Sequence, residues 1–119
     1  MEMKIRNLRF PAVIGVHEWE KKYTRQFVLQ LELEYDASMA AATDEITYAV
    51  NYTAVEARLM QLAASHPWQL IETLAESAAT MVLEDFPTVS MVALTIEKPQ
   101  ALHHSESVSV TTRKYRVNH

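Results

Sequence analysis

The clearest pattern of hydrophobic and polar positions in the chain covers residues 26–36. Every second side chain there is apolar or aromatic, and most of those between are polar; the apolar set is Phe27, Leu29, Leu31, Leu33 and Tyr35. A period of two predicts a β-strand with one face against a core. Further strands are predicted over residues 5–14, 88–97 and 105–115, and Pro11 places the first of them at an edge or a bulge.

Two helices are predicted between the second and third strands. Thr53 and Glu56 have the spacing of a capping box, so the first helix is expected to begin there and to end before Pro67. The second is expected over residues 68–84, because apolar side chains recur there at helical spacing. Its predicted inward residues are Leu70, Ile71, Leu74, Ala75, Ala78, Met81 and Val82. Residues 38–50 are expected to form an irregular connection with about one helical turn.

The element order ββααββ predicts an α+β fold, a four-stranded antiparallel sheet whose one face is covered by two helices. We expect a single domain over residues 1–119. Such a sheet has two open edges, and unpaired edges favour pairing with another copy of the chain. A ring of subunits joined edge to edge would close them, with the polar sheet face lining a central channel.

The composition excludes several function classes. The chain has 119 residues, 49% of them hydrophobic, a net charge of −4 and no cysteine. No stretch is strongly basic, which argues against non-specific binding to nucleic acid or to an anionic membrane. Without cysteine there is no thiol nucleophile and no thiolate zinc site. Neither a signal core nor a membrane span is found, so a cytoplasmic protein is expected.

Phosphate-loop and metal chemistry are also disfavoured. Gly15 is the single glycine, so a glycine-rich phosphate loop cannot form. The adjacent pair His103 and His104 would point to opposite sides of an extended loop, which is a poor arrangement for two metal ligands. No acidic cluster has ligand spacing. We therefore expect neither a metal nor another cofactor.

Glu72 is the first candidate for chemistry, because it lies in the first turn of the second predicted helix. It can be a hydrated glutamate favoured by the helix dipole. In the other interpretation its two coplanar oxygens accept parallel N–H bonds from the edge of a flat, nitrogen-rich ligand.

Three further residues each have two interpretations. Tyr52 is either a core tyrosine at a helix start or a phenol that donates a hydrogen bond or a proton. Lys98 is either a solvated strand-end lysine or an acid/base group or amine nucleophile. Glu20 is either a solvated loop residue or a group that positions a substrate hydroxyl or a water.

Four short segments, taken together, resemble the dihydroneopterin aldolase family of folate biosynthesis. In chain order they read IGVHEWE at 14–20, VNY at 50–52, LIETLAE at 70–76 and IEKP at 96–99. The resemblance covers residues 4–113. It implies the tunnelling fold (T-fold), in which four subunits form a barrel of antiparallel strands and two rings stack into an octamer. The active sites then lie between neighbouring subunits.

The resemblance also implies the reaction and the roles of site residues. The substrate would be 7,8-dihydroneopterin, cleaved to 6-hydroxymethyl-7,8-dihydropterin and glycolaldehyde, with epimerisation to the monapterin isomer as a side activity. The position of Glu72 would hold the 2-amino and N3 edge of the pterin, helped by the backbone near Val50 and Ile71. Lys98 would transfer protons with a bound water. The neighbouring subunit would supply Tyr52, and Glu20 would complete the site.

Two alternatives remain open. Residues 101–110 look closer to the sister branch of the family, the dihydroneopterin triphosphate 2′-epimerases. An epimerase would need cations near the side-chain end of its substrate, and the candidates are Lys21, Lys22, Arg25, His103 and His104. The other alternative is a catalytically idle pterin or purine binder, or a structural ring protein.

Overall fold

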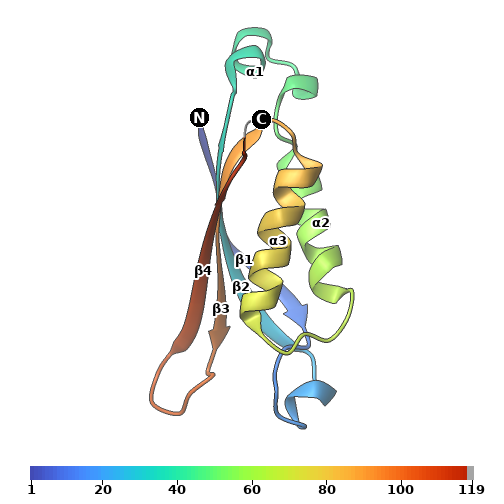
Figure 1. Ribbon diagram of the computed structural model, residues 1–119, viewed down its shortest axis with the longest axis vertical. Helices are drawn as coiled ribbons and strands as arrows, with labels where there is room; N and C mark the ends of the chain where they lie inside the picture. Colours follow the sequence, from blue (N-terminus) through green and yellow to red (C-terminus); the bar gives the residue numbers. More distant parts are fainter. Residues whose placement is uncertain (118–119) are drawn as a thin grey trace.

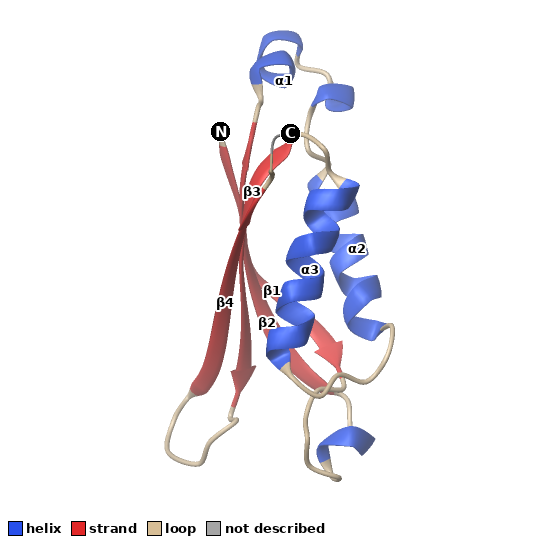
Figure 2. Ribbon diagram, in the orientation of Figure 1, coloured by secondary structure: helices blue, strands red, loops and turns tan. Residues whose placement is uncertain are grey.

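The computed structural model of the protein describes residues 1–117 and contains one four-stranded antiparallel sheet in the order β1-β2-β3-β4. The strands are β1 (Glu2–Ala12), β2 (Arg25–Tyr35), β3 (Val89–Pro99) and β4 (Ser107–Tyr115). The helices α2 (Tyr52–Ala64) and α3 (Ile71–Asp85) lie on the same face of the twisted sheet (Figures 1 and 2). This confirms the predicted ββααββ order.

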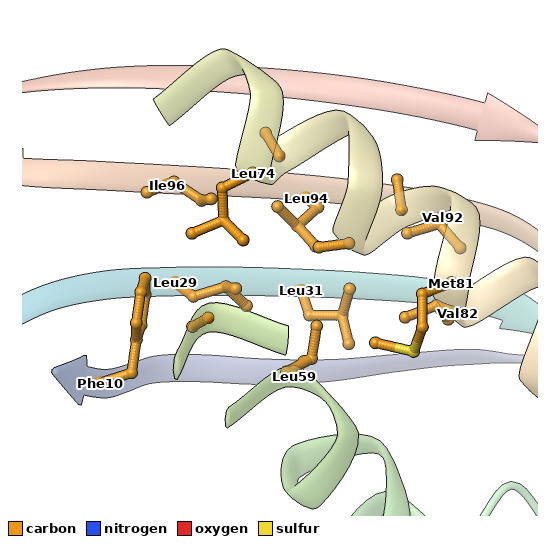
Figure 3. Close-up of a cluster of buried hydrophobic side chains, with 14 of the residues drawn as sticks. Phe10, Leu29, Leu31, Leu59, Leu74, Met81, Val82, Val92, Leu94 and Ile96 are labelled. Carbon is orange, nitrogen blue, oxygen red and sulfur yellow. The ribbon is translucent and has the colours of Figure 1, made fainter. Parts of the chain in front are cut away.

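The core lies between the sheet and the two helices (Figure 3). The alternation in β2 has the predicted consequence, since Phe27, Leu29, Leu31 and Leu33 are buried. On β3, the buried residues Val92, Leu94 and Ile96 face α3, which packs mainly over β3 and β4. Burying such side chains contributes roughly 1.5–3 kcal/mol each, which fixes the register of the sheet beneath the helices.

Strand β1 carries a bulge near its middle. The pairing with β2 shifts between Ile5 and Leu8, and Asn7 adopts a left-handed φ of 54°. The amide side chains of Asn7 and Gln30 hold the bulge together, because the Gln30 Nε2 donates to the Asn7 Oδ1 at 2.6 Å and the Asn7 N–H donates to the Gln30 Oε1 at 2.9 Å. Asparagine tolerates this φ better than most residues.

The segment between β2 and α2 forms the end of the molecule farthest from the β1–β2 turn (Figure 1). It contains the short helix α1 (Ser38–Thr43) and a 3₁₀ helix η2 (Ile46–Tyr48), neither of which has a buried residue. We call residues 38–52, which include the first residue of α2, the distal segment.

The predicted start of the first helix was wrong. Helix α2 is capped by Asn51, whose side chain accepts hydrogen bonds from the backbone N–H groups of Thr53 at 3.1 Å and Ala54 at 3.2 Å. Asparagine is a strong N-cap residue, so it takes the place that the capping-box spacing assigned to Thr53.

The second helix begins at Ile71 rather than near Trp68. Trp68 instead pairs with Ile14 in a bridge beyond the end of β1, and its indole N–H donates to the Ala63 carbonyl oxygen at 3.2 Å. Leu70 was predicted to point inward but is 45% exposed, because it precedes the helix and does not share the helical period. Lys98 lies within β3, not in the following loop.

Candidate active site

A pocket of about 490 Å³ lies at the end of the molecule where α3 begins and β3 ends. Four pieces of chain form it: the segment after β1, the start of β2, the start of α3 and the loop after β3. Their lining residues include Gly15, His17, Trp19, Glu20, Arg25, Ile71, Glu72, Lys98, Gln100 and His103. A volume of this size is typical of a small-molecule site.

Glu20 is the one buried charged residue in the described part of the chain, with 4% of its surface exposed. It is the first residue of the 3₁₀ helix η1 (Glu20–Lys22), and its backbone N–H donates to the His17 carbonyl oxygen at 3.0 Å, which closes the turn before this helix. The interpretation of Glu20 as a solvated loop residue is therefore wrong.

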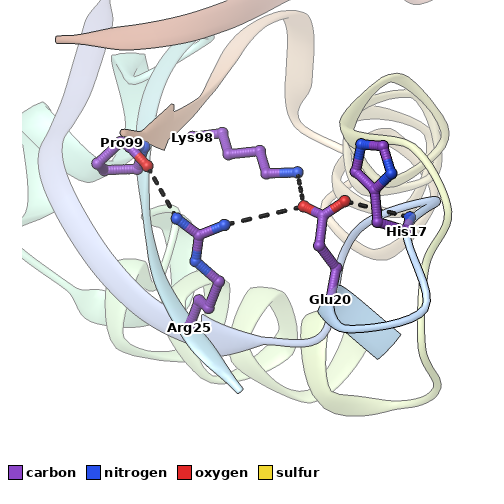
Figure 4. A network of polar contacts seen from close by, with 5 residues as sticks. All are labelled: His17, Glu20, Arg25, Lys98 and Pro99. Atoms are coloured by element: carbon purple, nitrogen blue, oxygen red, sulfur yellow. Dashed lines mark hydrogen bonds and ion pairs between the residues drawn. The ribbon is translucent and has the colours of Figure 1, made fainter. Parts of the chain in front are cut away.

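Both carboxylate oxygens of Glu20 have partners (Figure 4). Its Oε2 accepts a hydrogen bond from the Lys98 Nζ at 2.5 Å and lies 3.8 Å from the Arg25 Nη1. Its Oε1 accepts from the backbone N–H of His17 at 3.3 Å. A carboxylate with two cations and an amide N–H is fully paired, which is what makes its burial tolerable.

The environment of Glu20 favours its charged form. Burial alone would raise the pKa of the Glu20 carboxyl, but the hydrogen bonds from Lys98 and from the His17 N–H outweigh it, aided by the positive charge of Lys98. The pKa of Glu20 therefore lies below its ordinary value of 4.5. At neutral pH the site holds a carboxylate next to an amine.

Lys98 is also largely shielded, since 17% of its side chain is exposed. This corrects the interpretation of Lys98 as a solvated strand-end lysine. It reaches the pocket because it lies next to the end of β3, where the strand runs into the loop that begins at Gln100.

Arg25 links the site to the loop that carries Trp19. Its guanidinium lies 5.7 Å from the centre of the Trp19 ring, and its Nη2 donates to the Pro99 carbonyl oxygen at 3.3 Å. On the same loop the rings of His17 and Trp19 are parallel, with their centres 6.3 Å apart. These contacts hold the loop against the end of β3 and so fix one wall of the pocket.

Glu72 lies in the first turn of α3 and lines the same pocket. The side chain of Glu72 is exposed, whereas the neighbouring Ile71 is buried, with 7% of its surface exposed. Glu20, Lys98 and Glu72 are thus brought together from three separate segments of the chain.

Tyr52 and Val50 do not line this pocket. Tyr52 is the first residue of α2 and is 63% exposed, so it is not the core tyrosine that one interpretation predicted. Helix α2 has 13 residues, a length of about 20 Å, and it runs from the distal segment toward the pocket end (Figure 1). Within one chain Tyr52 therefore lies far from Lys98. Val50 is buried near the same helix start.

Of the five candidate cations, Arg25 and His103 line the pocket, whereas Lys21, Lys22 and His104 do not. Sequence reasoning missed Trp19, His17 and Gln100 as lining residues. Their signal was weak, because each is an exposed loop residue without a periodic pattern. Gln100 has one unusual property, a left-handed φ of 57° immediately after the strand that carries Lys98.

Among residues 1–117, no group of three His, Cys, Asp or Glu side chains is placed to hold a metal ion. No helix in this range has the length and apolar character needed to cross a membrane.

Comparisons with known proteins identify the family of the chain. The family model for dihydroneopterin aldolase (FolB) matches residues 3–113. The dihydroneopterin aldolase of Haemophilus influenzae is 32% identical over 106 residues, 89% of each chain. The dihydroneopterin triphosphate 2′-epimerase of Pseudomonas aeruginosa is 26% identical over 114 residues, 96% of this chain and 92% of the relative.

A solved structure of a relative has the same fold as this chain. The structure of Escherichia coli dihydroneopterin aldolase in complex with neopterin superposes with a TM-score of 0.91 at 24% identity, covering 96% of this chain and 98% of the other. The sheet and its two helices therefore form a T-fold domain. The chain belongs to the dihydroneopterin aldolase family, which includes the triphosphate 2′-epimerase branch.

Proposed function

We propose that the protein is a dihydroneopterin aldolase of folate biosynthesis. The observation that carries this proposal is the buried Glu20–Lys98 pair, which lies in the same pocket as the Glu72 carboxylate. The pair would transfer protons at one side of the pocket, and Glu72 would bind the pterin at another.

Glu72 would bind the pterin edge. A pterin presents its 2-amino group and its N3–H as two parallel donors, and a carboxylate presents two acceptors in one plane. Backbone groups near Ile71 would add contacts from the same helix start. A ligand that lacks the paired donors would leave the two Glu72 oxygens without these hydrogen bonds, which gives discrimination.

Lys98, with a bound water, would move the protons of a retro-aldol cleavage. The proton of the 2′-hydroxyl leaves, the C1′–C2′ bond breaks, and its electron pair enters the C6=N5 double bond as N5 takes up a proton. Glycolaldehyde is released. Loss of the N5 proton and protonation of C1′ then give 6-hydroxymethyl-7,8-dihydropterin, so the atoms and protons balance. The ring supplies the electron sink, and Lys98 acts as an acid/base group rather than as a covalent one.

Glu20 would position Lys98. Both oxygens of Glu20 already accept hydrogen bonds, one from Lys98 and one from the His17 N–H, which supports a role in holding the amine in place.

The second candidate is dihydroneopterin triphosphate 2′-epimerase, favoured by one observation. Arg25 and His103 line the pocket, and a triphosphate requires cationic side chains at the side-chain end of its substrate. Epimerisation uses the same bond cleavage followed by re-addition of the aldehyde to the opposite face. The relative from Pseudomonas aeruginosa, named as such an epimerase, is similar over nearly the whole chain.

Incubation with 7,8-dihydroneopterin and, separately, with its triphosphate distinguishes the candidates by chromatography of the products. Release of glycolaldehyde from dihydroneopterin supports the aldolase. Formation of only the epimer from the triphosphate supports the epimerase, and no change in either substrate leaves a binder without catalysis. Borohydride trapping of substrate on Lys98 would contradict the acid/base role.

We also propose that the chain assembles into four-membered rings, which pair into an octamer. Strands β1 and β4 are the two edges of the sheet, and each can pair with the other edge of a neighbouring copy. The ring would bring Tyr52 and the backbone near Val50 of one copy to the Lys98 site of the next. The exposure of Tyr52, at the end of α2 remote from the pocket of its own chain, supports this arrangement.

Mixing two inactive variants tests the shared site. Tyr52→Ala and Lys98→Ala chains, unfolded together and refolded at equal amounts, would form some sites with an intact tyrosine from one copy and an intact lysine from the other. Random mixing predicts about one quarter of wild-type activity. If the two residues served the same site within one chain, the mixture would stay inactive. Light scattering that finds a stable monomer at micromolar concentration would also exclude the ring.

A further inference from the structure

Gly15 lies in direct contact with the buried carboxylate of Glu20. A Cβ atom built on Gly15 would lie 2.5 Å from both the Cβ and the Oε1 of Glu20, and closer still to its Cδ. Carbon atoms that are not bonded to each other approach to about 3.5 Å. No side chain larger than hydrogen fits at this position while Glu20 keeps its place.

The backbone conformation of Gly15 is not what requires glycine. No glycine in the described chain has a positive φ, so an alanine at this position meets no left-handed strain. The three heavy atoms nearest to the built Cβ all belong to Glu20. The conflict is therefore with the Glu20 side chain.

Hydrogen bonds restrict movement of both partners. The Gly15 N–H donates to the Trp68 carbonyl oxygen at 3.0 Å, and the Trp68 N–H donates to the Val13 carbonyl oxygen at 2.8 Å, which ties this segment to the end of the core. On the other side, the turn from His17 to Glu20 is closed by its own backbone hydrogen bond at 3.0 Å. An added methyl group would have to displace Glu20 from Lys98.

We propose that Gly15 is a positioning residue, which lets the Glu20 carboxylate lie against the main chain where it orients the Lys98 amine. In this role Gly15 acts through Glu20, although its backbone also lines the pocket. The kinetic consequence rests on the function proposed above, but the effect on Lys98 does not.

The first test needs no substrate. Gly15→Ala, Glu20→Ala and wild type are treated briefly with an amine-acetylating reagent, and modification of Lys98 is measured by mass spectrometry against that of the exposed Lys4. We expect Lys98 in Gly15→Ala to react about three- to tenfold faster than in wild type, as in Glu20→Ala, because an amine held in an ion pair reacts slowly. Thr24→Ala, an exposed change near the end of the same loop, is the control and keeps the wild-type rate.

The second test uses the double variant Gly15→Ala/Glu20→Gly, which removes the atoms that the new methyl group would strike. If Gly15 acts only through Glu20, this variant equals Glu20→Gly alone in Lys98 reactivity, melting temperature and turnover. If Gly15→Ala alone does not fold, a folded double variant also shows that Gly15 acts through Glu20.

Two results would overturn the proposal: wild-type reactivity of Lys98 in Gly15→Ala, or a double variant that is unfolded although Glu20→Gly is folded. A protein that converts neither dihydroneopterin nor its triphosphate, but shows the expected change at Lys98, would refute the proposed function and leave the role of Gly15 intact.

Discussion

The two ends of the molecule differ in whether their side chains find partners within the same chain. The pocket end is where Glu20, Lys98 and Arg25 meet, and the distal segment is the other end. At the pocket end one chain buries the carboxylate of Glu20 and supplies all of its partners, Lys98, Arg25 and the His17 N–H. In the distal segment, α1 and η2 bury no residue, and Ile46 is 69% exposed.

This difference separates the contacts that one chain makes by itself from those that the proposed assembly would add. The Glu20–Lys98 pair is preorganised within the chain, so it needs no partner to form. The exposed apolar side chains of the distal segment, Met39, Ile46, Tyr48 and Tyr52, gain by contact with another surface. The following variants test the comparison from the largest expected effect to the smallest.

Lys98→Ala removes the proposed acid/base group of the pocket end. We expect turnover to fall by about 10²–10⁴-fold while pterin binding is retained, because general acid–base groups contribute effects of this size. Stopped-flow or steady-state kinetics with 7,8-dihydroneopterin, together with a fluorescence titration of the pterin, measures both. Loss of binding equal to the loss of turnover would mean that Lys98 holds the substrate instead.

Glu72→Ala removes the proposed recognition group. We expect pterin binding to weaken by about 100-fold or more, since the two parallel donors of the pterin edge lose both of their acceptors. Calorimetric titration measures this, and Glu76→Ala, one turn further along α3 and outside the pocket lining, is the matched control. Tight binding retained in Glu72→Ala would exclude the role.

Glu20→Gln tests the electrostatics of the pocket end through pH. The pKa of Glu20 is lowered by folding, so its ionised form stabilises the protein above the unfolded value of 4.5, and this contribution is lost as the pH falls through the lower folded pKa. We expect Glu20→Gln to be less stable than wild type by about 1–3 kcal/mol at pH 7. The difference should shrink below pH 4.5. Urea unfolding at several pH values measures it, and a difference independent of pH would contradict the assignment.

Ile46→Ser tests the distal segment and should have the smallest effect on folding. An exposed side chain changes the free energy of unfolding of a single chain by less than about 0.5 kcal/mol. We expect assembly to weaken measurably, because the distal segment loses an exposed apolar side chain that a neighbouring copy would cover. Sedimentation at a series of concentrations gives both the mass and its concentration dependence. Unchanged association would place the contact elsewhere.

The fold could be predicted largely because its burial pattern repeats. The alternation in β2 and the helical period in α3 each record which side meets the core, and both were interpreted correctly. Errors occurred at the ends of elements. Leu70 and Trp68 continue an apolar run into α3 but belong to the strand-like segment before it, where a bridge to Ile14 decides their positions.

The candidate site could be predicted only through resemblance. No local sequence pattern indicates that Glu20 is buried. Charged residues lie near it in the sequence, and its partners Lys98 and Arg25 come from the strands β3 and β2. The single glycine indicated only the end of a strand, and its contact with Glu20 depends on a turn that folds back by five residues. Pairing over such distances in the sequence leaves no periodic signal.

The bulge at Asn7 has a consequence for how an open sheet edge behaves in a crowded solution. A long, flat edge strand is a template for uncontrolled addition of further strands, the route to fibrous aggregates. In β1 the register breaks at Asn7, and Pro11 lacks an N–H to donate, so the edge offers only short regular stretches. A partner shaped to the bulge can still pair with this strand, whereas an arbitrary extended peptide cannot follow it for long. The Asn7–Gln30 amide pair thus limits how far an extended peptide can add to this edge of the sheet.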